Sequence, residues 1–242
     1  MVNTTREYKK TGPIVYHVLE PMIQSSKQTT VILYHGWGGN VANYDEAALE
    51  IATKGYTVLI PELIHHNTRN PIENPFTSSA QQKYFWETIF TSIEELDLII
   101  ESESVAEEQI VLIGNSMGGF IANGVFSKKN KLKGLATING SGSFLLTEKL
   151  FRKQDGRPEL SLEEEIMLKK YDPIGKQVAT GSIFILHGDS DRIIPIEGNQ
   201  DYYRYLTEIE GKTNIDFRVY PNVNHQFTDE MFADVLHWLE CL

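Results

Sequence analysis

The segment Gly114-Asn-Ser-Met-Gly118 has the residue types and spacing of a strained turn that presents a nucleophile. It directly follows the apolar run Ile110–Ile113 and directly precedes a stretch with helical apolar spacing. A serine at the tip of such a turn needs glycine on each side, because Cβ atoms there would collide with the neighbouring strand and helix. Ser116 is therefore the predicted nucleophile, with an ordinary tight or phosphate-binding turn as the alternative.

A serine hydroxyl is a poor nucleophile at neutral pH and needs a histidine base, which in turn needs a carboxylate to orient it. Asp189 and Asp191 both follow the apolar run Ser182–Leu186. Asp191 is the predicted acid and Asp189 the alternative, since either could be a turn former. His225 lies between the last predicted strand and the last predicted helix, where the chain order Ser…Asp…His places the base.

Acyl chemistry also needs two backbone N–H groups that face the developing oxyanion. The residue after the nucleophile, Met117, is predicted to supply one of them from the start of a helix. The other is expected in the glycine-rich loop His35–Gly39, with the main chain of Trp37 as the predicted donor. This loop could also be a plain turn between a strand and a helix.

The elements that must position these residues are short apolar strands that alternate with amphipathic helices. Strands are predicted at 14–18, 29–34, 56–60, 109–113, 135–138, 182–186 and 216–220, and helices at 44–53, 82–102, 116–127, 197–208 and 227–239. Near-continuous apolar strands are typical of a parallel sheet that is covered on both faces. The predicted fold class is therefore α/β, with a mostly parallel central sheet flanked by helices.

Two longer segments interrupt this alternation. Residues 65–79 are rich in Pro, Asn and Thr and are predicted to form a long loop. Residues 141–181 have mixed character, with a helix start at Ser161–Glu165. Since long loops in compact domains are usually functional or disordered, we expect a short lid insertion at about 141–181. The whole chain, 1–242, is predicted to form a single domain.

Taken together, four segments resemble the α/β-hydrolase superfamily: Gly114–Gly119, His35–Trp37, His187–Pro195 and the loop around His225. The resemblance covers about residues 30–240. Within the superfamily, the chain looks most like bacterial serine esterases related to dienelactone hydrolases and like the catalytic domain of prolyl-oligopeptidase-type peptidases. It implies the α/β-hydrolase fold for this chain.

The resemblance also implies roles for individual residues. These are Ser116 as nucleophile, Asp191 as acid, His225 as base, and the amides of Trp37 and Met117 as the oxyanion hole. Two departures are visible. Dienelactone hydrolases use a cysteine nucleophile where this chain has serine. Oligopeptidases carry an extra N-terminal domain, whereas only a short segment precedes the first predicted core strand here.

The function implied is that of a serine hydrolase, a carboxylesterase that cleaves carboxylic esters through an acyl-enzyme. A peptidase, thioesterase or acyltransferase of the same fold, or a non-catalytic binding protein, are the alternatives. The acyl pocket is expected to be apolar, with Trp37, Phe120, Phe144 and Ile194 as its predicted substrate-binding residues. No metal or organic cofactor is predicted, because the chain lacks paired Cys/His spacing for zinc.

Composition narrows the classes of partner. The 242 residues include 22 Lys and Arg against 33 Asp and Glu, a net charge of −11, which disfavours a nucleic-acid or anionic-membrane binder. A small-molecule ester is the expected partner. Residues 1–10 lack the apolar region of a secretory signal, and the apolar runs are too short to span a bilayer. The single cysteine, Cys241, forms no internal disulfide. We therefore expect a cytoplasmic protein.

Overall fold

The structure is a computed structural model that describes residues 6–21, 28–176 and 179–242. The first five residues and two residues of the predicted insertion, 177 and 178, lie outside these ranges. The strands are β1 (Arg6–Thr11), β2 (Ile14–Leu19), β3 (Thr30–Tyr34), β4 (Thr57–Pro61), β5 (Ile110–Asn115), β6 (Gly134–Ile138), β7 (Ser182–Gly188) and β8 (Ile215–Tyr220). The helices are α1 (Asp45–Thr53), α2 (Ser78–Glu103), α3 (Met117–Lys128), α4 (Phe144–Asp155), α5 (Leu162–Tyr171), α6 (Glu197–Arg204) and α7 (Asp229–Glu240).

All eight strands form one sheet in the order β1-β2-β4-β3-β5-β6-β7-β8. From β4 through β3 to β8 along this order, each strand is parallel to the next, whereas β2 pairs antiparallel with both β1 and β4. The predicted α/β class with a mostly parallel sheet is confirmed. Because parallel strands end on the same side, the loops after β3, β5, β7 and β8 meet at one edge of the sheet.

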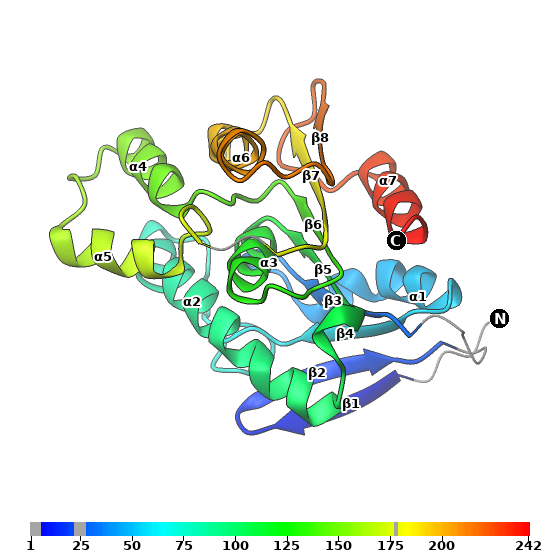
Figure 1. Cartoon of the computed structure of the whole chain (residues 1–242). Helices are drawn as coiled ribbons and strands as arrows, with labels where there is room; N and C mark the ends of the chain where they lie inside the picture. Colours follow the sequence, from blue (N-terminus) through cyan, green and yellow to red (C-terminus); the bar gives the residue numbers. More distant parts are fainter. Residues whose placement is uncertain (1–5, 22–27, 177–178) are drawn as a thin grey trace.

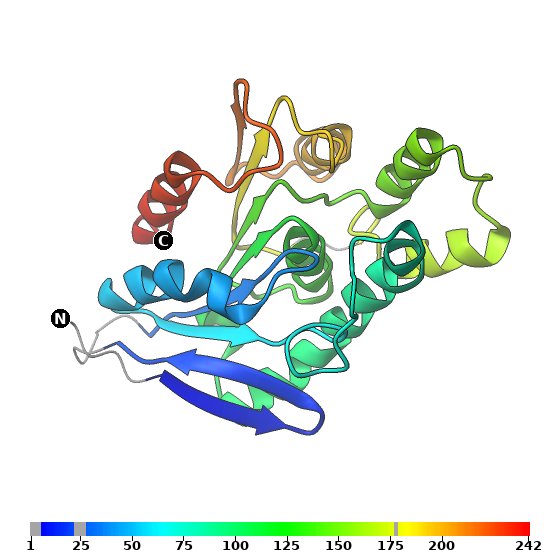
Figure 2. The same ribbon diagram turned by 180° about the vertical axis from the view of Figure 1, so that it is seen from behind.

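Helices cover both faces of the sheet, as Figures 1 and 2 show. Side chains alternate along each strand, so that Val31 and Leu33 of β3 belong to one core cluster and Ile32 and Tyr34 to the other. The first cluster packs against α1 and α7, and the second against α2, α3 and α6. This two-sided burial is the reason why the strands are nearly continuous apolar runs.

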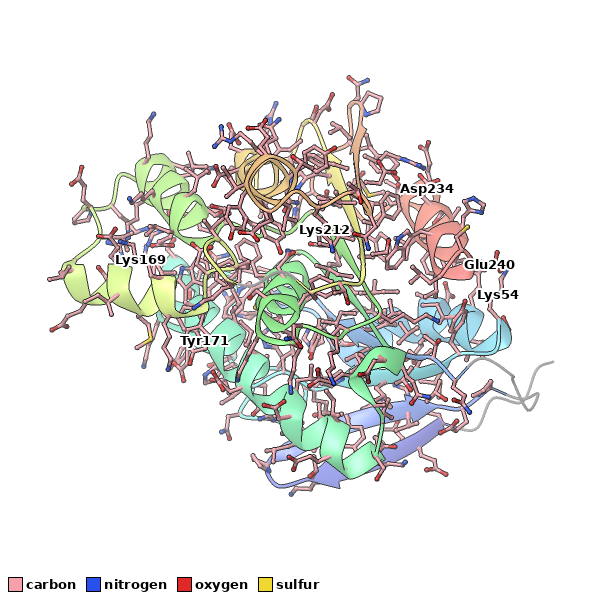
Figure 3. The ribbon with its side chains drawn as sticks, viewed as in Figure 1. Lys54, Lys169, Tyr171, Lys212, Asp234 and Glu240 are labelled. Atoms are coloured by element: carbon pink, nitrogen blue, oxygen red, sulfur yellow. The ribbon has the colours of Figure 1, made fainter. Side chains whose placement is uncertain are left out.

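The helices α1 and α7 lie side by side on their face of the sheet, where Lys54 and Glu240 meet near their C-terminal ends (Figure 3). Lys54 Nζ and Glu240 Oε1 are 2.7 Å apart, and both side chains are 41% exposed. An ion pair this exposed contributes little to stability, because water screens both charges. The apolar side chains of Ile51 and Val235, both fully buried, therefore hold these helices to the sheet.

The segment predicted as an insertion forms two helices, α4 and α5. The predicted helix start is confirmed, since Ser161 Oγ accepts from the Glu164 N–H and the Glu164 carboxylate accepts from the Ser161 N–H. At the other end of α5, Tyr171 stacks on Phe90 of α2 with ring centroids 4.3 Å apart (Figure 3). This stacking joins α5 to the rest of the helical layer.

Three elements differ from the sequence predictions. The edge strand β1 and the helix α4 were not predicted, and α2 begins at Ser78, inside the last residues of the predicted loop. The β1 residues are mostly polar and partly exposed, so they lack the apolar pattern of a buried strand. No helix in the described ranges is long and apolar enough to cross a membrane.

Candidate active site

Ser116 occupies a strained turn between β5 and α3. Its backbone has φ 56° and ψ −123°, a conformation that non-glycine residues rarely adopt. Other backbone segments approach this turn so closely that two of its positions have no room for a side chain. A Cβ atom on Gly118 would lie 2.1 Å from the Tyr34 carbonyl oxygen, and one on Gly114 would lie 2.1 Å from the Gly118 carbonyl oxygen. Glycine is therefore required at both positions, because a Cβ atom would collide with the backbone. The tight turn places Ser116 at the edge of the sheet.

The structure brings Ser116, His225 and Asp191 into one chain of contacts. His225 Nε2 lies 2.8 Å from Ser116 Oγ, and His225 Nδ1 lies 2.7 Å from Asp191 Oδ2. The Asp191 side chain is 0% exposed, whereas that of His225 is 21% exposed. With Nδ1 donating to the carboxylate, Nε2 is left as an acceptor for the serine proton, which is the tautomer that general-base chemistry needs.

The Asp191 carboxylate is held as an anion by several donors. Its Oδ1 accepts from the backbone N–H groups of Ile193 and Ile194 at 2.8 and 3.0 Å. The ring of His187 lies on the other side, with Nε2 3.4 Å from Oδ2. Burial alone would raise the pKa of Asp191, but the hydrogen bonds from His187, His225 and Ile194 outweigh it and hold this pKa well below its usual range.

The alternative acid, Asp189, does not contact the imidazole of His225. Its Oδ1 accepts from the Asn222 N–H at 2.7 Å and from the Ser190 hydroxyl at 2.9 Å. Asp189 thus stabilises the neighbouring turn. Of the two carboxylates that the sequence left open, the geometry brings Asp191 to the histidine.

The loop after β3 passes directly over the serine. A Cβ atom on Gly36 would lie 3.1 Å from the Ser116 Cβ, a tight contact that glycine avoids. Within the described part of the chain, the amide N–H groups of Trp37 and Met117 donate no hydrogen bond to the protein. Met117 is the first residue of α3, where N–H groups lack an intrahelical acceptor. Both predicted donors are therefore free to bind an oxyanion.

A cavity of ≈ 250 Å³ opens beside Ser116. Its lining includes two of the predicted substrate-binding residues, Trp37 and Ile194, together with residues from α2 and from the segment that contains α4. The full lining is Trp37, Ser78, Gln81, Gln82, Phe85, Trp86, Ser116, Glu148, Phe151, Gln154, Asp155, Arg157, Arg192, Ile193 and Ile194. The cavity thus has an aromatic wall and a polar rim.

The prediction that Phe120 and Phe144 line the pocket is wrong. Both side chains are 0% exposed and neither reaches the cavity. The ring of Phe120 instead packs behind those of Phe85 and Trp86, with centroids 5.5 and 5.6 Å away. An aromatic residue one turn after the nucleophile faces the core here, because α2 supplies the layer that meets the cavity.

The polar side of the cavity is built around a buried carboxylate. Glu148 of α4 is 4% exposed and accepts from the indole Nε1 of Trp86 at 2.8 Å. It also accepts from Arg152 Nε at 2.7 Å and from Arg157 Nη1 at 2.9 Å. These donors satisfy the buried charge. They also fix the orientation of Trp86, so this aromatic wall is rigid.

Sequence reasoning missed several lining residues, including Phe85, Phe151 and Arg157. The helical spacing of Phe85 along α2 was visible in the sequence, but only packing shows that it faces the cavity. Phe151 and Arg157 lie in and after α4, which was not predicted. In the described ranges, no group of three or more His, Cys, Asp or Glu side chains is arranged to hold a metal ion.

Comparison with known proteins identifies the family of the chain. A model of the dienelactone hydrolase family matches residues 16–234 of the chain. The chain belongs to the dienelactone hydrolase family. It is thus a hydrolase.

Two relatives of this family member are esterases by name. Esterase YjfP of Escherichia coli is 24% identical over 215 residues, 83% of each chain. The putative esterase YitV of Bacillus subtilis is 20% identical over 240 residues, 93% of each chain. Among solved structures, TT1662 from Thermus thermophilus superposes with a TM-score of 0.77 at 18% identity, covering 99% of this chain and 98% of that one. An acylaminoacyl peptidase from Pyrococcus horikoshii has a TM-score of 0.74 at 14% identity, covering 99% of this chain and 42% of its own length. Both structural likenesses show the α/β-hydrolase fold.

Proposed function

We propose that this member of the dienelactone hydrolase family is a serine esterase, which cleaves carboxylic esters through an acyl-enzyme. The observation that carries the proposal is the paired contact of His225, at 2.8 Å from Ser116 Oγ and 2.7 Å from Asp191 Oδ2. Two curated relatives with esterase names support the choice of substrate class.

In the proposed reaction, Ser116 Oγ attacks the ester carbonyl carbon while His225 Nε2 takes the hydroxyl proton. The N–H groups of Trp37 and Met117 stabilise the negative charge on the carbonyl oxygen. The protonated His225 then gives its proton to the leaving alcohol, and the acyl-enzyme remains. Water, activated by the same imidazole, attacks the acyl carbon and releases the acid. Throughout, Asp191 stabilises the imidazolium and fixes its orientation.

The cavity favours small esters with an apolar part. Its volume of ≈ 250 Å³ accommodates a small acyl or alcohol group. Phe85, Trp86 and Phe151 present ring surfaces, while Arg157 is neutralised by Glu148 at 2.9 Å. Burial of an apolar substrate group against these rings would supply binding free energy in proportion to the area covered.

The decisive experiment is Ser116→Ala assayed with p-nitrophenyl esters of short and medium acyl chains. Loss of the nucleophile is expected to lower turnover by roughly 10⁴–10⁶-fold. The matched control is Ser190→Ala, which removes an exposed hydroxyl bonded to Asp189 and should leave turnover unchanged. Turnover of the Ser116→Ala protein within several-fold of the wild type would contradict the proposal.

A second measurement tests the covalent step directly. A fluorophosphonate should add one adduct to the wild-type protein and to Ser190→Ala, and none to Ser116→Ala, as seen by intact mass. Parallel assays with aminoacyl anilides and acyl-CoA thioesters separate an esterase from a peptidase or a thioesterase. Faster turnover of an anilide or a thioester than of every simple ester would overturn the substrate class while leaving the nucleophile in place.

A further inference from the structure

The loop Gly36–Gly39 over the nucleophile is held through its own amide groups. The Gly39 N–H donates to the Gly36 carbonyl oxygen at 3.1 Å. The Gly38 N–H donates to the imidazole of His66 at 3.0 Å. Among the described residues, the Trp37 N–H has no hydrogen-bond acceptor.

His66 reaches this loop from a different part of the chain, after β4. Its Nδ1 lies 2.9 Å from the Ile64 carbonyl oxygen, which can only accept, so Nδ1 carries the proton. Nε2 is therefore the acceptor for the Gly38 N–H. The side chain is 4% exposed, and its ring makes an edge contact with the indole of Trp37 at a centroid distance of 5.1 Å. Burial lowers the pKa of His66, which favours the neutral form that both contacts require.

The backbone on both sides of His66 adopts a strained, left-handed conformation. His65, Asn67 and Asn70 have φ values of 66°, 50° and 52°, in the left-handed region. A β-carbon makes this region unfavourable, least so for Asn. The segment is closed by the His65 N–H on the Arg69 carbonyl at 2.8 Å and by the Arg69 N–H on the His66 carbonyl at 2.9 Å. Such strain persists only where the surroundings over-determine the conformation.

Buried charges supply that constraint. Arg69 Nη1 donates to the Glu62 carbonyl oxygen at 2.7 Å, and the guanidinium makes a two-pronged contact with Glu95 of α2 at 2.8 and 2.5 Å. The Glu62 carboxylate accepts from both the N–H and the hydroxyl of Thr68. Together these bonds tie the residues on both sides of His66 to α2 and to the end of β4.

The same segment touches the loop at a second point. The Trp37 indole Nε1 donates to the Pro75 carbonyl oxygen at 2.8 Å. A Cβ atom on Gly38 would lie 2.4 Å from the ring of Phe76, so that this ring covers the glycine. The residues between β4 and α2 therefore hold the Trp37 side chain on one side and the Gly38 amide on the other.

We propose that His66 is a positioning residue of the esterase site, which holds the Gly38 N–H so that the neighbouring Trp37 N–H faces the oxyanion formed at Ser116. The inference rests on the proposed function, since it concerns a donor that acts only when an acyl carbon becomes tetrahedral. Its contact is to the loop and not to the substrate. It therefore acts on the transition state through the geometry of Trp37.

The test compares His66→Gln with His66→Met. These side chains have the same length and both lose the donor to Ile64, but only Gln offers a strong acceptor to the Gly38 amide. His66→Asn is the complementary variant, because its amide can still donate to the Ile64 carbonyl while being too short to reach Gly38. His65→Asn is the matched control, since it changes the neighbouring ring and keeps a residue that tolerates φ 66°.

Removal of an oxyanion donor costs roughly 10²–10³-fold in kcat, and a displaced donor should cost part of this. We expect His66→Met and His66→Asn to lower kcat about 10–100-fold with KM changed by less than about 3-fold. His66→Gln should stay within about 3-fold of the wild type, and His65→Asn should be unchanged. Affinity for a trifluoromethyl ketone, which forms a tetrahedral adduct with the serine, should weaken in parallel with kcat.

Fluorophosphonate titration of competent sites corrects every kcat for the folded fraction. Equal kcat for His66→Met and His66→Gln would overturn the inference, as would a loss of ketone affinity in both alike. Failure of both His66→Met and His66→Asn to fold, with His66→Gln folded, would show a structural role only and would overturn it as well. An inactive wild-type protein, or one that the fluorophosphonate does not label, would instead refute the proposed esterase function.

Discussion

His35 is so completely buried that it resists protonation in the folded protein. We therefore expect low pH to decrease the free energy of unfolding through this side chain. The residue is 0% exposed, its Nδ1 donates to the Gly36 carbonyl at 2.9 Å, and its Nε2 has no hydrogen-bond partner among the described residues. A second proton on Nε2 would be an unpaired buried charge, with the ring of His66 at 5.1 Å. Burial lowers the pKa of His35 from 6.5 to about 4.

The sign and size of the effect follow from this shift. Above pH 6.5 neither the folded nor the unfolded chain protonates His35, and the folded state keeps its full stability. As the pH falls below 6.5, His35 binds a proton in the unfolded chain, whereas in the folded chain it stays neutral down to about pH 4. The free energy of unfolding should therefore decrease by about 1.4 kcal/mol per pH unit in this window. Between about pH 7.5 and about pH 5 the loss from His35 is about 2 kcal/mol.

Urea unfolding of the wild type and of His35→Gln at these two pH values isolates the contribution of His35 to the free energy of unfolding. The wild type should lose about 2 kcal/mol more than the variant on acidification, or roughly 4–8 °C in Tm for a chain of this size. Burial also lowers the pKa values of His17 and His66, but both residues are present in the two proteins, so their contributions cancel. The reasoning is refuted if acid costs the wild type and the variant the same free energy.

Two further predictions concern the turn and the acid. Gly118→Ala places a Cβ 2.1 Å from the Tyr34 carbonyl oxygen, so we expect a loss of about 3 kcal/mol and a Tm lower by roughly 6–12 °C in a thermal melt; an unchanged Tm would contradict the close approach. Asp191→Asn should lower ester turnover by roughly 10³–10⁴-fold, whereas Asp189→Asn, which does not touch His225, should stay within several-fold; the reverse order in a p-nitrophenyl ester assay would exchange their roles.

The central fold could be predicted because buried strands have a recognisable apolar sequence. A sheet covered on both faces demands apolar residues at every strand position, as in Thr30–Tyr34, where all five residues are buried. The same argument fails for β1, Arg6–Thr11, because an edge strand with exposed residues has no such demand. It fails for α4 for another reason. Its N-cap residue, Ser143, is followed by Leu146 at the third helical position instead of Glu or Gln, so the capping-box pattern is absent.

The residues of the proposed triad could be picked out from the sequence, whereas the residues that line the cavity beside them could not. Ser116 sits in a turn whose glycines are fixed by local contacts, so its motif is local in sequence. The orientation of Phe120 and Phe85 depends on how α3 and α2 pack together, and helical spacing says nothing about which of the two meets a cavity. His65, His66 and Glu62 form a weak cluster in the sequence, typical of a loop or a pocket wall. The contact of His66 with Gly38 could not be predicted from it, because that contact depends on the conformation of a loop far from it in sequence.

The loops that carry Asp191 and His225 are joined by a residue outside the proposed triad. Asn139 follows β6 with φ 48°, and its side chain accepts from the Gly188 N–H at 3.0 Å and donates to the Gln226 carbonyl at 2.8 Å. It thereby links the strand end before Asp191 to the residue after His225. Because the side chain is 1% exposed, water does not compete for either bond. Asn tolerates the left-handed conformation better than most residues do, and this conformation lets one short amide reach both loops. A residue at the end of a third strand thus joins the two loops that carry the carboxylate and the imidazole.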